Sequence, residues 1–226
     1  MDTRVITKEA LDFLSQLEQN NNREWFTAHK KTFKRLESQV KGFYGHLKEL
    51  MGTHDEIERL KLFRMYRDIR FSKDKTPYKT HFAGSFSRAG AERRGGYYLQ
   101  IKPGGSFIAT GFWEPNPNDL LRIRKELEMD ASRFREVVND RSFKKVWGDL
   151  EGEEVKTAPK GFSKDDPNID LIRKKRFIFM HHFTDREVLD QDFMEEVNAS
   201  FKAVRPYFDL MSEILTTSLN GESVLD

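Results

Sequence analysis

Basic side chains are concentrated in residues 61–81, which we call the basic segment. It carries seven Lys or Arg and two Asp, a balance of +5, whereas the whole chain carries only +2. Arginine binds phosphate or carboxylate through two parallel hydrogen bonds, and lysine adds mobile positive charge. The basic segment therefore predicts a binding site for a small anionic or phosphorylated ligand. The predicted ligand-binding residues are Arg64, Arg67, Arg70, Lys73, Lys75 and Lys79.

Acid–base chemistry is a second expectation for the same segment. Asp68, Tyr78 and His81 stand among the cations, and a carboxylate or imidazole beside arginine can have a pKa suited to proton transfer. We expect Asp68 to orient the arginines, and Tyr78 or His81 to contact the ligand. No diagnostic spacing accompanies these three residues, so they are candidates, and whether the protein is an enzyme stays open.

Two other interpretations of the charges also stay open. In the first, Asp68 and Asp74 pair with the cations, and the resulting network only stabilises the fold. In the second, an aromatic face of a sheet binds single-stranded nucleic acid by stacking bases on rings and holding phosphates with basic side chains. The residues of this nucleic-acid alternative are Tyr97, Tyr98, Phe112, Arg93, Arg94 and Lys102.

Other kinds of site have no pattern in this sequence. The chain has no cysteine, which removes disulfides, thiolate nucleophiles and Cys-ligated zinc. No two of the six histidines have a metal-ligand spacing, and His181 and His182 would point to opposite faces of a strand. No phosphate-loop or dinucleotide fingerprint follows the paired glycines at 95–96 and 104–105. We expect no metal site, and any cofactor is unknown.

The elements in the first half of the chain follow from apolar periodicity. Thr7 and Asn22 are predicted to cap successive helices, the second running over residues 23–51 and ending before Gly52. A short helical stretch is predicted near residues 55–60. Apolar and polar residues then alternate over residues 63–71, which predicts a strand with a cationic face that leads into a turn.

The second half of the chain alternates between strand and helix signals. The predicted strands cover residues 82–86, 97–102, 107–113 and 176–183, with a hairpin at Pro103-Gly104-Gly105-Ser106. Helices are predicted over residues 119–128, 131–139, 141–147 and 191–219, the last divided or kinked by Pro206. This order predicts an α+β fold, with a mainly antiparallel sheet packed by long amphipathic N- and C-terminal helices. Without a linker or repeat, we expect one domain over residues 1–226.

Targeting and membrane signals are missing from the sequence. The first residues lack the apolar core of a signal peptide, and no apolar run has the length of a membrane span. We therefore expect a soluble, cytoplasmic protein without a membrane partner. The oligomeric state does not follow from the sequence.

Four blocks of this sequence resemble a known family. They are residues 22–26 (Asn-Arg-Glu-Trp-Phe), residues 66–79 of the basic segment, residues 96–98 (Gly-Tyr-Tyr) and residues 158–161 (Ala-Pro-Lys-Gly). Together they are similar to the microbial domain of unknown function 2461, over about residues 11–208. The resemblance implies a soluble, single-domain protein and supplies no activity, cofactor or catalytic residue to carry over.

Overall fold

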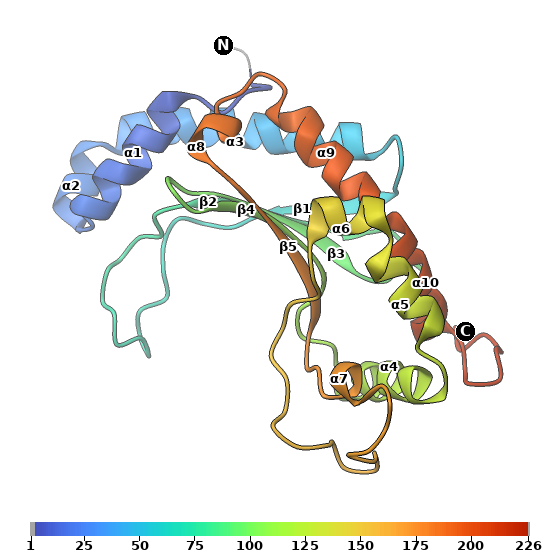
Figure 1. The fold of residues 1–226 in the computed structure, drawn as a ribbon. Coiled ribbons are helices and arrows are strands. Elements are labelled where there is room, and N and C mark those ends of the chain that lie inside the picture. The colour runs from blue at the N-terminus through green and yellow to red at the C-terminus, as the bar shows by residue number, and fades with distance from the viewer. Residues whose placement is uncertain (1–2, 226) are drawn as a thin grey trace. The chain divides into compact units, whose positions relative to one another are not determined.

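The computed structural model describes residues 3–225, and Figure 1 shows the arrangement of its elements. Ten helices and five strands in these residues confirm the predicted α+β fold. The helices are α1 (Lys8–Gln19), α2 (Arg23–Ala28), α3 (Lys30–Met51), α4 (Pro117–Met129), α5 (Ser132–Asn139), α6 (Arg141–Trp147), α7 (Ile169–Ile172), α8 (Asp185–Val188), α9 (Phe193–Ala203) and α10 (Arg205–Thr216). The strands are β1 (Ile57–Leu62), β2 (Phe82–Arg88), β3 (Gly96–Ile101), β4 (Ser106–Phe112) and β5 (Phe177–Phe183).

The N-terminal helices begin where the sequence predicts. Thr7 and Asn22 each accept a hydrogen bond from a backbone N–H in the first turn of the helix that follows. The single helix predicted over residues 23–51 is wrong, because His29 separates α2 from α3. Its backbone leaves helical geometry at φ −100° and ψ 8°, and its Nδ1 lies 2.8 Å from the Trp25 carbonyl oxygen. The histidine side chain thus meets a carbonyl group at the C-terminus of α2.

The five strands form one antiparallel sheet in the order β1-β2-β3-β4-β5. Neighbouring strands in the sheet are therefore also consecutive in the sequence. The hairpin predicted at residues 103–106 joins β3 to β4, with its turn one residue earlier, at residues 102–105. The helical stretch predicted near residues 55–60 is wrong, because residues 57–62 form the edge strand β1. Pairing with β2 decides the conformation of residues 57–62, and local propensity carries no information about that pairing.

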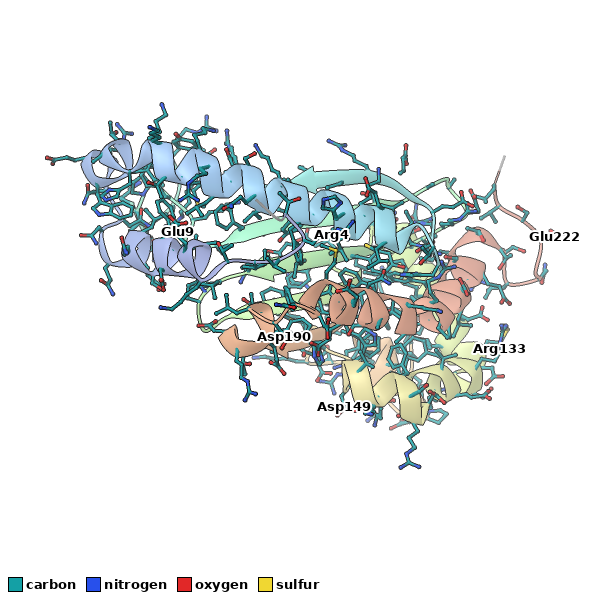
Figure 2. All side chains as sticks on the ribbon, turned by 90° about the horizontal axis from the view of Figure 1, so that it is seen from above. Arg4, Glu9, Arg133, Asp149, Asp190 and Glu222 are labelled. Carbon is teal, nitrogen blue, oxygen red and sulfur yellow. The ribbon has the colours of Figure 1, made fainter. Side chains whose placement is uncertain are left out.

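The chain divides into two compact units, which we describe separately. The first consists of the described residues up to Phe86, together with Tyr98–Ile108 and His182–Ala199. In this unit α3 packs on one face of the sheet, since Phe33 stacks near Phe82 and Tyr44 near Phe86. The Tyr44 hydroxyl also donates a buried hydrogen bond of 2.9 Å to the Leu99 carbonyl. Glu9 of α1, labelled in Figure 2, forms an ion pair with Arg35 of α3.

The second unit consists of Ser87–Tyr97, Ala109–His181 and the described residues from Ser200 onward. Its core is built around Tyr207 of α10, whose buried hydroxyl donates to the Phe177 carbonyl at 2.9 Å. Arg133 of α5, labelled in Figure 2, pairs with Glu213 of α10 at 2.7 Å. The predicted division at Pro206 is confirmed, because α9 ends at Ala203 and α10 begins at Arg205.

Helix length and composition also bear on membranes. Among residues 3–225, no helix is both long enough and apolar enough to cross a bilayer.

Candidate anion-binding site

Most of the basic segment, residues 63–81, forms a long loop rather than the predicted strand. Figure 1 shows residues 63–81, here called the basic loop, as two irregular arms that join β1 to β2. The arms meet at one antiparallel bridge between Tyr66 and Tyr78. The flanking hydrogen bonds run from Arg67 N–H to the Pro77 carbonyl (2.9 Å) and from Lys79 N–H to the Met65 carbonyl (2.8 Å). The predicted strand over residues 63–71 is therefore wrong, and its cationic face does not form.

The base of the basic loop is fixed to the corner between α1 and α2. The Tyr78 ring stacks on Phe26, with ring centroids 3.9 Å apart and planes inclined by 15°. The Asn21 carboxamide donates to the Tyr78 carbonyl at 2.9 Å and accepts from the Tyr78 N–H at 3.1 Å. Two of the sequence blocks that resemble the family, residues 22–26 and 66–79, thus meet at this corner.

Two of the predicted ligand-binding arginines are occupied by carboxylates. Arg67 pairs with Asp74 and also donates to the Thr76 side chain and carbonyl. Arg70 donates two side-chain hydrogen bonds to Asp68, from Nε to Oδ1 (3.0 Å) and from Nη2 to Oδ2 (2.6 Å). For these two arginines, the structure matches the contacts that the network interpretation describes.

The pKa values of the two carboxyl groups reflect this pairing. The Thr76 N–H, with the Arg67 guanidinium and the Thr76 hydroxyl, lowers the pKa of Asp74 to about 2. The side-chain hydrogen bond from Arg70 is the main cause that lowers the pKa of Asp68. Both groups are therefore carboxylates at neutral pH. Lys75 is also engaged, since its Nζ donates to the Ile69 carbonyl at 3.0 Å.

The three remaining cations of the predicted set are Arg64, Lys73 and Lys79. Within residues 3–225, none of them forms an ion pair, whereas Arg67 and Arg70 both do. Lys73 is exposed, but Lys79 is half-buried and its Nζ lies 5.3 Å from the centre of the Phe63 ring. Burial, and secondarily the charge of Arg64, lower the pKa of the Lys79 ammonium group. Two cations thus repel each other at the base of the loop.

His81 lies in the same positive environment. Burial, and secondarily the charges of Lys79 and Lys102, lower its pKa to about 4. The imidazole is therefore neutral at neutral pH, with one N–H to donate and one nitrogen to accept. Lys102 differs from Lys79 because its Nζ lies 3.1 Å from a carboxylate oxygen of Glu18.

The structure does not join the three candidate catalytic residues to one another. Asp68 contacts Arg70, and burial raises the pKa of the Tyr78 hydroxyl, which makes it a weaker acid. Among the described residues, no hydrogen bond connects Asp68, Tyr78 and His81. No group of three His, Asp or Glu in residues 3–225 has the spacing of a metal site.

The residues of the nucleic-acid alternative are not gathered on one open face. Tyr97 and Phe112 are buried, while Tyr98 is half-buried. Their basic partners hold carboxylates: Arg93 pairs with Glu92, Arg94 with Asp119 and Lys102 with Glu18.

Sequence reasoning did not single out two residues of this site. Phe63 and Lys61 lie beside Lys79, with the Lys61 Nζ 5.5 Å from the centre of the Phe63 ring. Lys61 contributed to the charge count but not to the predicted set. The sequence offered no clear signal for it, because the end of β1 at Leu62, which puts Lys61 and Phe63 on the same face, follows only from the folded structure.

The comparisons with known proteins give one match. No curated protein and no solved structure is similar enough to match this chain. A family model described as "Conserved hypothetical protein (DUF2461)" matches residues 9–210. This span covers most of the chain and includes the whole basic loop, which confirms the resemblance predicted over about residues 11–208. The chain therefore belongs to the DUF2461 family of conserved hypothetical proteins.

Proposed function

We propose that the protein binds a small anionic ligand, such as a phosphorylated compound, at the base of the basic loop. The observation that carries this proposal is the pair Arg64 and Lys79, which have no carboxylate partner within residues 3–225. A half-buried ammonium group is costly unless an anion is paired with it. A bound anion would supply that missing partner and relieve the repulsion between the two cations.

The six predicted ligand-binding residues take different parts in this proposal. Arg64 and Lys79 hold the anion, and the exposed Lys73 contributes only long-range attraction. Arg67, Arg70 and Lys75 instead shape the loop through Asp74, Asp68 and the Ile69 carbonyl. Because their donors are already engaged, we do not assign them to the ligand.

His81 adds a neutral donor to the proposed site. An anion beside Lys79 would offset the positive charges that lower the pKa of His81, so binding favours uptake of a proton by the imidazole. We assign no catalytic step to the site, because Asp68, Tyr78 and His81 form no connected acid–base group.

Calorimetric titration with inorganic pyrophosphate at low ionic strength tests the proposal. We expect Arg64→Gln and Lys79→Gln each to weaken binding by about tenfold, since a hydrogen bond to a charged group contributes about 1.5 kcal/mol or more. Lys164→Gln removes one exposed positive charge from a loop of the second unit and is the matched control. Its affinity should stay close to that of the unaltered protein.

The same titration separates the proposal from a purely structural network. In a purely structural network, Arg70→Gln would lower the Tm, while the pyrophosphate affinities of Arg64→Gln and Lys79→Gln would equal that of Lys164→Gln. Failure of the unaltered protein to bind pyrophosphate at low ionic strength would likewise overturn the proposal. Arg70→Gln should keep its affinity, because Asp68 already occupies that guanidinium.

A further inference from the structure

Four aromatic rings form a continuous row across the sheet in the first unit. The ring centroids of Phe63 and Tyr98 are 6.2 Å apart. Tyr98 and Phe107 follow at 5.5 Å, and Phe107 and His182 at 5.7 Å. The row thus begins just after β1 and continues through β3, β4 and β5.

This row lies on the face of the sheet opposite α3. Side chains alternate between the two faces of a strand, and Phe82 and Phe86 of β2 contact α3. Tyr98 and Phe107 alternate with the fully buried Leu99 and Ile108, and keep part of their own surface exposed.

Small side chains make the contact between the first two rings possible. On the row's face of β2, the residues are Ala83 and Ser85, and the Phe63 N–H donates to the Ala83 carbonyl at 2.9 Å. Phe63 therefore lies beside β2 and reaches over its small residues to Tyr98, two strands away. His182, at the other end of the row, is exposed.

Positive charge is gathered at one end of the row. Lys79 and Lys61 lie 5.3 Å and 5.5 Å from the Phe63 ring centre, and Arg64 follows Phe63 directly in the chain. Among the described residues, no cation lies over the rings of Tyr98 or Phe107 in the same way. The surface therefore combines a cationic end with an aromatic extension, in which neighbouring rings are inclined to one another by 33° to 43°.

We propose that the ligand of the anion site is a mononucleotide, with its phosphate against Arg64 and Lys79 and its base on the aromatic row. This inference rests on the proposed function and names the ligand class of the same site. All four kinds of nucleobase stack on aromatic side chains, because every base has a flat π face. A single nucleotide fits better than a strand, since a strand needs cations along the row rather than at one end.

A ligand panel on the complete, unaltered chain tests this proposal. The panel is AMP, GMP, CMP and UMP, with ribose 5-phosphate as the ligand that lacks a base and adenosine as the one that lacks a phosphate. We expect at least one mononucleotide to bind about tenfold or more tightly than ribose 5-phosphate. Adenosine should bind weakly, because it lacks the anion that Arg64 and Lys79 hold.

Two variants then locate the base. Tyr98→Leu should weaken mononucleotide binding by about tenfold and leave ribose 5-phosphate binding unchanged. Phe107→Leu should also weaken mononucleotide binding, and it replaces Tyr98→Leu in the experiment if that variant does not fold. Phe71→Leu is the matched control, since its ring is 96% exposed on the basic loop and takes no part in the row. Lys79→Gln should weaken both phosphorylated ligands.

The outcomes separate this proposal from the one on which it rests. In one outcome, mononucleotides and ribose 5-phosphate bind with equal affinity, and Lys79→Gln weakens both. That result would overturn the proposed base contact but would still support the anion site. Loss of nucleotide affinity in Phe71→Leu equal to that in Tyr98→Leu would also overturn it. If neither pyrophosphate nor any phosphorylated ligand binds, both proposals are wrong. An oligonucleotide that binds much more tightly than every mononucleotide would replace this proposal with the single-strand alternative.

Discussion

The Tyr78 ring lies flat against Phe26, with centroids 3.9 Å apart, while the Asn21 carboxamide bonds both backbone polar groups of Tyr78. This contact connects the second arm of the basic loop to the N-terminal helices. The Phe26 and Tyr78 rings are almost fully buried, whereas Phe71 at the outer part of the loop is exposed. The base of the loop is thus built into the core, and its outer part is not.

We expect Phe26→Ala to lower the free energy of unfolding by about 3–5 kcal/mol, because it leaves a cavity beneath Tyr78. Asn21→Ala should cost about 1–3 kcal/mol, since two backbone groups of Tyr78 lose their partners. Phe71→Ala should leave stability unchanged, as its ring is exposed. Urea unfolding measures all three. Equal effects of Phe26→Ala and Phe71→Ala would show that the loop base is not packed in this way.

The outer part of the basic loop depends on Asp74. Its carboxylate accepts from Thr76 and pairs with Arg67, and so joins the two arms. Among the described residues, Asp68 in contrast bonds only Arg70, two residues further along the same arm. We expect Asp74→Asn to speed tryptic cleavage of the native protein after Lys73 and Lys75 several-fold, because the loop opens more often.

Asp68→Asn is the control for this cleavage experiment. It removes one carboxylate from the same loop without disconnecting the arms, so its cleavage rate should stay near that of the unaltered protein. The effect of Asp74 should also weaken in acid. The pKa of Asp74 in the folded protein is about 2, against an ordinary 3.8, so its contribution is present above pH 3.8 and disappears as the pH falls toward 2.

Local signals in the sequence predicted much of the fold. The caps at Thr7 and Asn22 act within one helical turn, and the turn at residues 102–105 closes a hairpin whose strands are adjacent in the chain. Pro206 divides a helix through its own missing N–H and ring. Each of these features is decided by residues close together in the sequence, so pattern and propensity suffice.

The remaining features depend on partners far away in the sequence. Residues 57–62 become a strand because β2 is available beside them. Residues 63–71 do not, because Tyr66 forms an isolated β-bridge with Tyr78 that no ladder extends. The types of cation at the candidate site could be read from the sequence. The sequence does not reveal which of these cations pair with carboxylates, since Arg67 reaches Asp74 only through the folded shape of the loop.

Gly111 in β4 should tolerate no side chain. Its φ is +114°, and a Cβ atom would lie 2.2 Å from the Phe177 carbonyl oxygen of the neighbouring strand. We expect Gly111→Ala to cost at least about 3 kcal/mol of unfolding free energy, from backbone strain and a clash with a rigid carbonyl. Gly104 has φ +64° but open space around it, so Gly104→Ala should cost only about 1–2 kcal/mol. Similar Tm values for the two variants would contradict this geometry.

His81 should make the protein less stable in weak acid. Its pKa is about 4 when folded and 6.5 ordinarily, so the unfolded chain takes up the proton first as the pH falls. Stability from this group is complete above about pH 6.5 and is lost progressively toward pH 4. After allowance for partial exposure of the ring, the loss is about 1–2 kcal/mol. Urea unfolding at pH 7 and pH 4.5 should show this extra loss relative to His81→Gln.

The same histidine should make anion affinity depend on pH. Sulfate keeps its double charge through weak acid, so any change in its affinity comes from the protein. A sulfate ion near Lys79 offsets the charges that lower the pKa of His81, so protonation of His81 and sulfate binding favour each other. We expect the affinity of the unaltered protein to rise several-fold between pH 7 and pH 4.5. The rise should be clearly smaller in His81→Gln, which keeps Arg64 and Lys79 but does not titrate. Equal pH dependence in the two proteins would place the bound anion away from His81.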